Sequence, residues 1–416
     1  MVKYWLWLAT RKGLGSRGAL AVLRRFESPE QAYFAEEKDY AGIEALRDCK
    51  PLLDKDMREP EKILQQCYRK NIHILTYQDA AYPERLKNID DPPIVLYYQG
   101  TVPAIDTEPV IAMVGTRKAS AYGLLQAKQL GYQLGRHGAI VASGGAAGID
   151  TLCLKGALTA GRPVIAVLGC GVDVTYPASN QSLFEDIRHH GCLLSEFPPE
   201  TPPLPEHFPV RNRILSGLSL GVVVVEAPRK SGALITASRA LDQGRDVFAV
   251  PGNVGSPTCQ GNIQLLKDGA IVVEEGWDVM REYQHLYPTL IHRQSRPIDM
   301  TLTREEQEQQ SRRAPRRQKR QPVVASQTEY VETSDRKDVD NSENRAYIDV
   351  QELFDSVTPD ERVILELLSG GARNIDDIIA ESALPAGRIL ASMTLLEVKG
   401  YVKRLPGRVF SLAEKQ

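Results

Sequence analysis

Residues 110–118 read VIAMVGTRK and residues 139–150 read AIVASGGAAGID. Each stretch is a short, continuous apolar run that ends in a glycine-containing turn, as expected of a strand covered on both faces. Similar runs follow at 164–168, 192–194, 222–225, 247–250 and 270–273. Helical segments separate the early runs, which predicts βαβ units and a parallel sheet. The predicted fold class is therefore α/β, with a Rossmann-like core.

Glycine-rich turns follow most of these predicted strands. They occupy residues 115–118, 143–150, 169–173, 226–232 and 251–253. The carboxyl ends of parallel strands lie along one edge of the sheet, where open α/β proteins bind their ligands. Small residues let a ligand approach the backbone N–H groups, and helix N-termini at this edge favour anions. Several such turns, with arginines among them, predict a groove for a polyanion.

Composition limits the classes of protein to consider. The chain has 416 residues, enough for two or three domains, and its 42% hydrophobic and 25% charged residues are ordinary for a soluble globular protein. The formal net charge is −2, so nucleic-acid binding would depend on a local basic patch. The six cysteines show no metal-binding spacing, which predicts no metal site and a reducing cytoplasm as the location.

The chain divides into four predicted parts. Residues 1–75 have apolar residues at helical spacing and form a small helical domain, whose first apolar stretch is too short to span a membrane. Residues 76–285 hold a proline-rich lead-in and the Rossmann-like core. Residues 286–350 are rich in charged residues and serine, which predicts a disordered linker. Residues 351–416 predict three helices and a hairpin, the order of elements in a winged helix.

A glycine-rich turn also occurs in the helical domain. Residues 13–18 read GLGSRG and lie between two predicted helices. This segment is similar to the hairpin of a helix-hairpin-helix unit, whose backbone amides can contact a phosphate. A plain turn between two helices is the alternative interpretation.

Candidate binding residues follow the first two core strands. After the first strand come Gly115, Thr116, Arg117 and Lys118, and after the second come Ser143, Gly144 and Gly145. The planar fork of Arg117 suits a phosphate, although an ion pair with Asp150 or Glu226 is the alternative. Lys155, in the helix after the second strand, is either a second phosphate contact or a solvated side chain.

A second group of candidates lies at residues 208–213, which read FPVRNR and precede a predicted helix. We expect one of Arg211 and Arg213 to face the groove and the other to support it, with Asn212 between them. Phe208 is suited to stack on a nucleic-acid base. Its alternative role is a hydrophobic staple on the following helix.

Catalytic and cofactor motifs are missing from the sequence. The turn after the first strand has one glycine where a dinucleotide site needs three, and no P-loop or Gly-x-Ser-x-Gly elbow occurs. Asp150, Asp173 and Glu226 are candidates for a metal ligand or general base, but helix caps and ion pairs are the preferred interpretation. We therefore predict no catalytic residue, no cofactor and no enzymatic activity.

Together these motifs resemble the DprA/Smf family of bacterial DNA-processing proteins. The matching strings are VGTR (114–117), SGGAAGID (143–150), VLGCGVD (167–173), YP (176–177), SEFP (195–198), FPVRNR (208–213), SGALITA (231–237) and VPG (250–252). Many members also carry a helical domain before the core and a winged helix after it. The resemblance implies a protein that binds single-stranded DNA, protects incoming DNA and loads the recombinase RecA during natural transformation.

The resemblance also implies roles for particular residues. Arg117 matches the DNA-binding arginine of the family, and Lys155 lies in the helix where members carry a basic contact. The family forms dimers through the core, which implies a homodimer here. The chain departs from the family at Cys153-Leu154, where Ala-His is common, and at Val210, where relatives often carry a basic or polar residue.

Two alternative functions remain open. The first is a nucleotide or nucleoside-monophosphate hydrolase, because the phosphoribohydrolases share the general pattern of strands and glycines. Those enzymes carry Pro-Gly-Gly-x-Gly-Thr and a glutamate, whereas residues 251–253 read PGN without that continuation. The second is duplex binding by the winged helix. Arg388 is among few basic residues of its third predicted helix, which favours a protein-contact or regulatory role.

Overall fold

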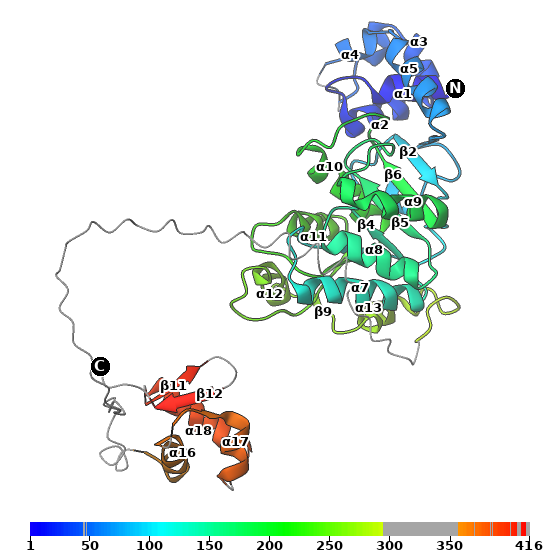
Figure 1. The fold of residues 1–416 in the computed structure, drawn as a ribbon. Helices are drawn as coiled ribbons and strands as arrows, with labels where there is room; N and C mark the ends of the chain where they lie inside the picture. The colour runs from blue at the N-terminus through cyan, green and yellow to red at the C-terminus, as the bar shows by residue number, and fades with distance from the viewer. Residues whose placement is uncertain are drawn as a thin grey trace, which may run out of the picture. The chain divides into compact units, whose positions relative to one another are not determined.

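The computed structural model describes residues 1–293 except 45 and 47, and residues 357–412 except 370, 383, 385, 400 and 406–408. The predicted linker lies outside the described residues from position 294 onward. The chain forms two compact units, residues 1–318 and 319–416 (Figure 1). The first unit holds the helical domain and the α/β core, and the second holds the winged helix.

A nine-stranded sheet forms the centre of the core, in the order β1-β2-β6-β5-β4-β3-β7-β8-β9. Seven strands are parallel, and they are β3 (Val110–Val114), β4 (Ile140–Ser143), β5 (Val164–Leu168), β6 (Gly191–Ser195), β7 (Gly221–Val224), β8 (Asp246–Ala249) and β9 (Ile271–Val272). Each coincides with a predicted apolar run to within a residue or two. The α/β class with a Rossmann-like sheet is confirmed.

Two antiparallel strands extend the sheet, and sequence reasoning missed both. β1 (His73–Thr76) pairs with β2 (Val95–Gly100), which in turn pairs with β6. The sheet therefore begins at His73, inside the predicted helical domain. The run of Ile, Val, Leu and two Tyr at 94–98 was a strand signal, but the prolines around it favoured a loop.

The core also continues past its predicted end at residue 285. Ile291 is fully buried in the main hydrophobic cluster, and the ring of His137 contacts the backbone oxygen of His292 at 3.0 Å. The predicted linker therefore starts too early. Two or three apolar residues in an otherwise polar stretch are enough to hold a segment against a helix, and composition does not reveal this.

Helices cover both faces of the sheet. α7 (Ala121–Arg136), α8 (Ile149–Thr159), α9 (Gln181–His190) and α13 (Gly276–Tyr283) share a cluster with Ile111 and Met113 of β3. α6 (Glu84–Lys87), α10 (His207–Leu218) and α11 (Gly232–Asp242) share the other with Val110, Ala112 and Val114. α12 (Gln260–Lys267) follows β8. Successive residues of β3 point to opposite faces, which is why an uninterrupted apolar run is needed.

The helical domain contains α1 (Val2–Ala9), α2 (Gly15–Phe26), α3 (Pro29–Phe34), η1 (Glu37–Tyr40), α4 (Lys50–Leu53) and α5 (Arg58–Arg69). A half-buried lysine in this domain is surrounded by aromatic rings. The amine of Lys55 lies 5.1 to 5.4 Å from the ring centroids of Trp7, Tyr33 and Tyr40 and donates to the Tyr40 hydroxyl at 3.0 Å. Burial lowers the pKa of Lys55.

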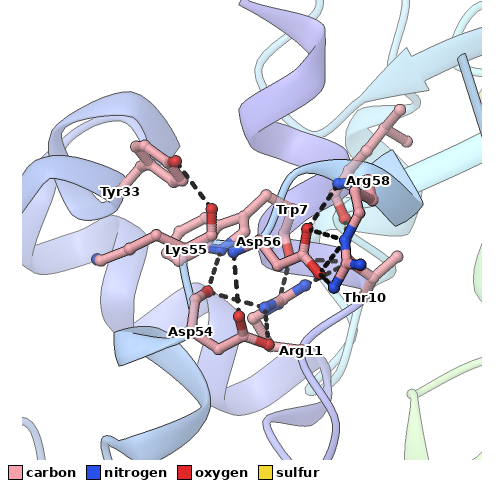
Figure 2. A network of polar contacts seen from close by, with 9 residues as sticks. Trp7, Thr10, Arg11, Tyr33, Asp54, Lys55, Asp56 and Arg58 are labelled. Atoms are coloured by element: carbon pink, nitrogen blue, oxygen red, sulfur yellow. Dashed lines mark hydrogen bonds and ion pairs between the residues drawn. The ribbon is translucent and has the colours of Figure 1, made fainter. Parts of the chain in front are cut away.

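Polar contacts around this lysine hold the connection between α4 and α5 to α1 (Figure 2). The indole N–H of Trp7 donates to the backbone oxygen of Asp54 at 2.8 Å, and Arg11 forms an ion pair with the Asp54 carboxylate at 2.8 Å. Tyr33 donates to the backbone oxygen of Lys55 at 2.9 Å. These bonds satisfy backbone groups of a segment that has no regular structure.

The second unit is a winged helix, as predicted. It contains α16 (Pro359–Ser369), α17 (Ile375–Glu381), α18 (Ala386–Val398) and a sheet of β10 (Arg373–Asn374), β12 (Val409–Leu412) and β11 (Val402–Leu405), in that order. Arg388 of α18 forms an ion pair with Asp360 at 2.6 Å. This arginine is thus already engaged by a carboxylate of its own domain. Among the described residues, no helix combines the length and apolar character needed to cross a membrane.

Candidate nucleic-acid interface

The topology leaves a crevice at one edge of the sheet. From β3 the chain proceeds through β4, β5 and β6 on one side, and it then crosses to β7, β8 and β9 on the other. The loops after β3 and β7 therefore diverge, which is the position where open α/β sheets bind ligands. A cavity of about 580 Å³ lies there. Its lining residues are Val114, Gly115, Thr116, Arg117, Lys118, Ala146, Asp150, Phe208, Arg211, Asn212, Leu215, Pro228, Lys230, Ser231, Gly232, Ala233, Thr236 and Thr258.

An arginine stacked on an aromatic ring lines this cavity. The guanidinium carbon of Arg117 lies 4.7 Å from the ring centroid of Phe208 and 5.9 Å from that of Tyr176. Arg117 is exposed, Phe208 is half-buried, and the two rings lie 5.9 Å apart. The cation–π contact orients the guanidinium of Arg117 over the Phe208 ring. Arg117 and Phe208 therefore form one unit, although they are ninety residues apart in the chain.

A second arginine lies beneath the first. Arg211 is only 4% exposed, and its Nη1 donates to the backbone oxygen of Val167. Its Nε is buried and has no hydrogen-bond partner among the described residues. A Cβ at Gly144 would collide with Nη1 of Arg211 and lie 2.6 Å from Oδ2 of Asp150. Glycine at 144 is thus needed because a buried arginine and a carboxylate both approach its backbone.

The charge of Asp150 is sensitive to pH. Burial raises the pKa of this carboxyl to about 6, against the opposing effects of Arg211 and Arg117. Burial also lowers the pKa of Arg211. Asp150 is therefore only about half ionised near pH 6 and carries its full negative charge beside the two guanidinium groups at higher pH. An anion that enters the cavity meets a more positive site when Asp150 is protonated.

We expect the affinity of the cavity for a polyanion to rise about threefold as the pH falls from about 8 to about 5, because Asp150 loses its negative charge. Fluorescence anisotropy with labelled oligo-dT at constant ionic strength measures this. Asp150→Asn should show a smaller pH dependence, which separates the effect of this carboxyl from that of other groups. An unchanged pH profile in Asp150→Asn would contradict this assignment.

The predicted residues after β3 and β4 have different positions. Gly115 packs against Ile149, and the Thr116 hydroxyl accepts from the backbone N–H of Lys118 at 3.2 Å, so 115–118 form a tight turn at the cavity. Ser143 is fully buried and donates to the backbone oxygen of Met113 at 2.7 Å. Gly145 has a φ of +65° and packs on the ring of Phe184. Ser143 and Gly145 thus shape the floor and do not line the cavity.

The segment 208–213 was predicted to precede a helix, and this was wrong. It forms the first turns of α10. Proline is tolerated at Pro209 because the first N–H groups of a helix have no intrahelical partner. Asn212 lines the cavity with Arg211. Arg213 points elsewhere and pairs with Glu196 at 2.6 Å and with Asp91 at 3.3 Å.

Other candidates lie outside the cavity. Lys155 is half-buried on α8 and is not among its lining residues. Asp173 pairs with Lys70 at 2.6 Å, and Glu226 is fully buried and accepts from the backbone N–H of Ser120 at 2.8 Å. Both carboxylates have structural partners, as preferred from the sequence. In the described parts of the chain, no cluster of three or more His, Cys, Asp or Glu side chains could hold a metal ion.

Sequence reasoning missed the contribution of the loop after β7. Lys230 and Ser231 line the cavity opposite Arg117, and Ser231 caps α11 by accepting from the backbone N–H of Ala233 at 3.2 Å. The turn at 226–232 was recognised as glycine-containing, but its lysine was not assigned to the site. The sequence carries no signal for this, because the pairing of β3 with β7, which places both loops at one crevice, is known only from the strand order of the structure.

The fold and this site define an open α/β protein with a basic, aromatic crevice at its topological switch point. Two models of known protein families match this chain. The family model described as DNA recombination-mediator protein A matches residues 73–284, and the model of the DprA winged helix domain matches residues 353–408. The chain belongs to this DprA/Smf family of DNA-processing recombination mediators, as its motifs predicted.

Individual relatives match between 53% and 68% of this chain. DNA processing protein DprA of Bacillus subtilis is 40% identical over 221 residues, which cover 53% of this chain and 74% of the relative. DprA of Streptococcus pneumoniae is 34% identical over 284 residues, which cover 68% of this chain and 99% of the relative. The X-ray structure of DprA from Streptococcus pneumoniae covers 68% of this chain and 98% of its own, with a TM-score of 0.61 and 35% identity.

Proposed function

We propose that this protein binds single-stranded DNA at the crevice between β3 and β7, protects incoming DNA and loads RecA onto it during natural transformation. The observation that carries the proposal is the guanidinium of Arg117 over the ring of Phe208, at a cavity of about 580 Å³. An exposed arginine can bind a phosphate, and the neighbouring aromatic surface can take a base or sugar. Membership of a family of DNA-processing recombination mediators supports this interpretation.

The geometry favours a single strand over a duplex. A base in a duplex is stacked between its neighbours and cannot reach a ring inside a crevice. A single strand can turn a base toward Phe208 while its phosphates face Arg117, Lys118 and Lys230. In the described part of the winged helix, Arg388 of the third helix is paired with Asp360 at 2.6 Å, which disfavours a duplex contact by this arginine.

We expect the full chain to bind labelled oligo-dT more tightly than a matched duplex. Affinity should fall steeply between about 50 mM and about 200 mM salt, since binding to phosphates releases counterions. Fluorescence anisotropy measures both quantities. Equal binding of the two probes, or none, would contradict the proposal, and release of free base from nucleoside monophosphates would favour the hydrolase instead.

RecA loading needs a separate measurement. RecA assembly on single-stranded DNA, followed with fluorescently labelled DNA, should be faster in the presence of this protein, and nuclease digestion of the bound strand should be slower. We propose a homodimer as the active form, which sedimentation equilibrium tests directly. Binding without faster RecA assembly would leave a single-strand binder and remove the mediator role.

A further inference from the structure

The cavity at the crevice continues into two neighbouring hollows. It shares Lys230, Ser231 and Gly232 with a hollow of about 730 Å³ along the exposed side of α11. That hollow shares Arg239 with a third, of about 770 Å³, between the helical domain and the core. Because neighbouring hollows share lining residues, the three follow one another from Arg117 to the beginning of α2, and together they are here called the α11 groove.

Basic residues dominate the α11 groove. Eight basic residues line it, namely Arg17, Arg117, Lys118, Arg211, Arg213, Arg229, Lys230 and Arg239. Four acidic residues line it, namely Asp91, Asp150, Glu196 and Asp242. The whole chain has a net charge of −2, so this surface departs in sign from the rest of the molecule. A local excess of positive charge along a groove is the electrostatic footprint of a polyanion site.

Three of the four acidic residues lie beside buried arginines. Glu196 and Asp91 both bind Arg213, which is 6% exposed, and Asp150 lies buried beside Arg211. The exposed cations Arg229 and Lys230 stand at the rim of the groove. Arg239 forms an ion pair with Asp242 at 4.0 Å. Both side chains are more than half exposed, so this pair offsets little of the positive charge of Arg239.

The far end of the α11 groove contains the first turn of α2. Gly15, Ser16 and Arg17 line it, and no side chain caps the N-terminus of this 12-residue helix. Arg213 lies beside this turn: its Nη2 and Nε pair with Glu196 and Asp91, and its buried Nη1 has no hydrogen-bond partner among the described residues. Arg17 is 71% exposed and its pair with Asp90 is 3.4 Å long between two exposed side chains, so it can exchange partners.

The floor between the two ends suits sugars and bases. Ile235 of α11 is 44% exposed and lines the middle hollow beside Leu234. A groove with cations at its rims and an aliphatic floor matches the alternation of phosphate and base along a single strand. A small anion would need only one end of it.

We infer that a single strand bound at Arg117 continues along α11 and that its backbone reaches the first turn of α2. The helical domain then forms the second end of the DNA site. Its glycine-rich turn at 13–18 serves as a phosphate contact, in line with the helix-hairpin-helix interpretation of its sequence. This inference rests on the proposed single-strand binding at the crevice.

A length series of oligo-dT tests the inference. Arg17→Ala with Arg239→Ala should weaken binding of a strand of about 20 nucleotides roughly tenfold and lower the magnitude of its salt slope by about 1.4, since two phosphate contacts to a single strand are lost. Binding of a strand of about five nucleotides should not change. Arg24→Ala with Lys38→Ala removes two exposed cations outside the α11 groove and should affect neither strand.

The outcomes separate this inference from the proposed function. If Arg117→Ala weakens both strands while the Arg17 and Arg239 double variant binds like wild type, the crevice site stands and the extension to α2 is wrong. If no variant changes binding, the crevice itself is wrong. A second readout uses the wild-type protein: 4-thiothymidine at one end of the long strand should cross-link to peptides within residues 13–24, and cross-links confined to the crevice would overturn the extension.

Discussion

Arg117→Ala is expected to weaken binding of oligo-dT by about 30-fold, which corresponds to about 2 kcal/mol. The substitution removes two linked interactions: the planar fork that can bind a phosphate bidentately, and the cation–π contact that holds this fork over Phe208 at 4.7 Å. Fluorescence anisotropy at fixed salt measures the loss. Because the side chain is exposed, the midpoint of urea unfolding should remain close to that of wild type.

Two variants make this result specific. Arg117→Lys keeps the positive charge but loses the fork and the flat stacking surface, so it should recover only part of the affinity. Lys38→Ala removes a cation that is 77% exposed on the helical domain and lies outside the cavity, and it should bind like wild type. Equal affinity of Arg117→Ala and wild type would count decisively against the crevice as the DNA site.

Gly156→Ala should lower the free energy of unfolding by about 3 kcal/mol, although it adds only one methyl group. α7 and α8 lie so close that a Cβ at Gly156 would collide with the backbone oxygen of Lys128, and a Cβ at Gly131 with the backbone oxygen of Cys153. Backbone atoms of a packed helix cannot rotate away as a side chain can. The two helices must separate, which opens the core on that face of the sheet. Urea unfolding followed by circular dichroism measures the effect.

Gly232→Ala is the matched control for this substitution. Gly232 begins α11, and a Cβ there meets no atom within 4 Å. Alanine is the better helix former, so the free energy of unfolding should change by less than about 1 kcal/mol. A similar loss of stability in both variants would show that the close approach of α7 and α8 is not the cause.

The fold was largely predictable from local patterns. A strand covered on both faces needs an unbroken apolar run, so the seven parallel strands were found within a residue or two. β2 was missed because prolines flank it and because one of its partners, β6, is distant in the chain. β1 was missed because it is short and pairs only with β2. The buried Ile291 was missed for a similar reason, since its packing against the core is a long-range contact.

The site was predictable only in part. The turn at 115–118 and Phe208, Arg211 and Asn212 line one cavity, whereas Arg213 lines another hollow and Lys155 lies outside both. The sequence alone identified the chemistry at the strand ends but not the direction of each side chain. Because α10 already begins at His207, residues 208–213 project from a helix and not from a loop, and this decides which of their side chains face the cavity.

The sequence by itself determined the α/β class, the chain order of the parallel strands, the winged helix and the DprA/Smf family. These follow from apolar periodicity and from glycines at strand ends, which are local properties of the chain. Only the tertiary structure decided that Arg117 stacks on Phe208, that Arg211 lies buried beside Asp150, and that α2 meets the far end of the α11 groove. Such contacts join residues far apart in the chain, and they arise from the strand order and from helix packing.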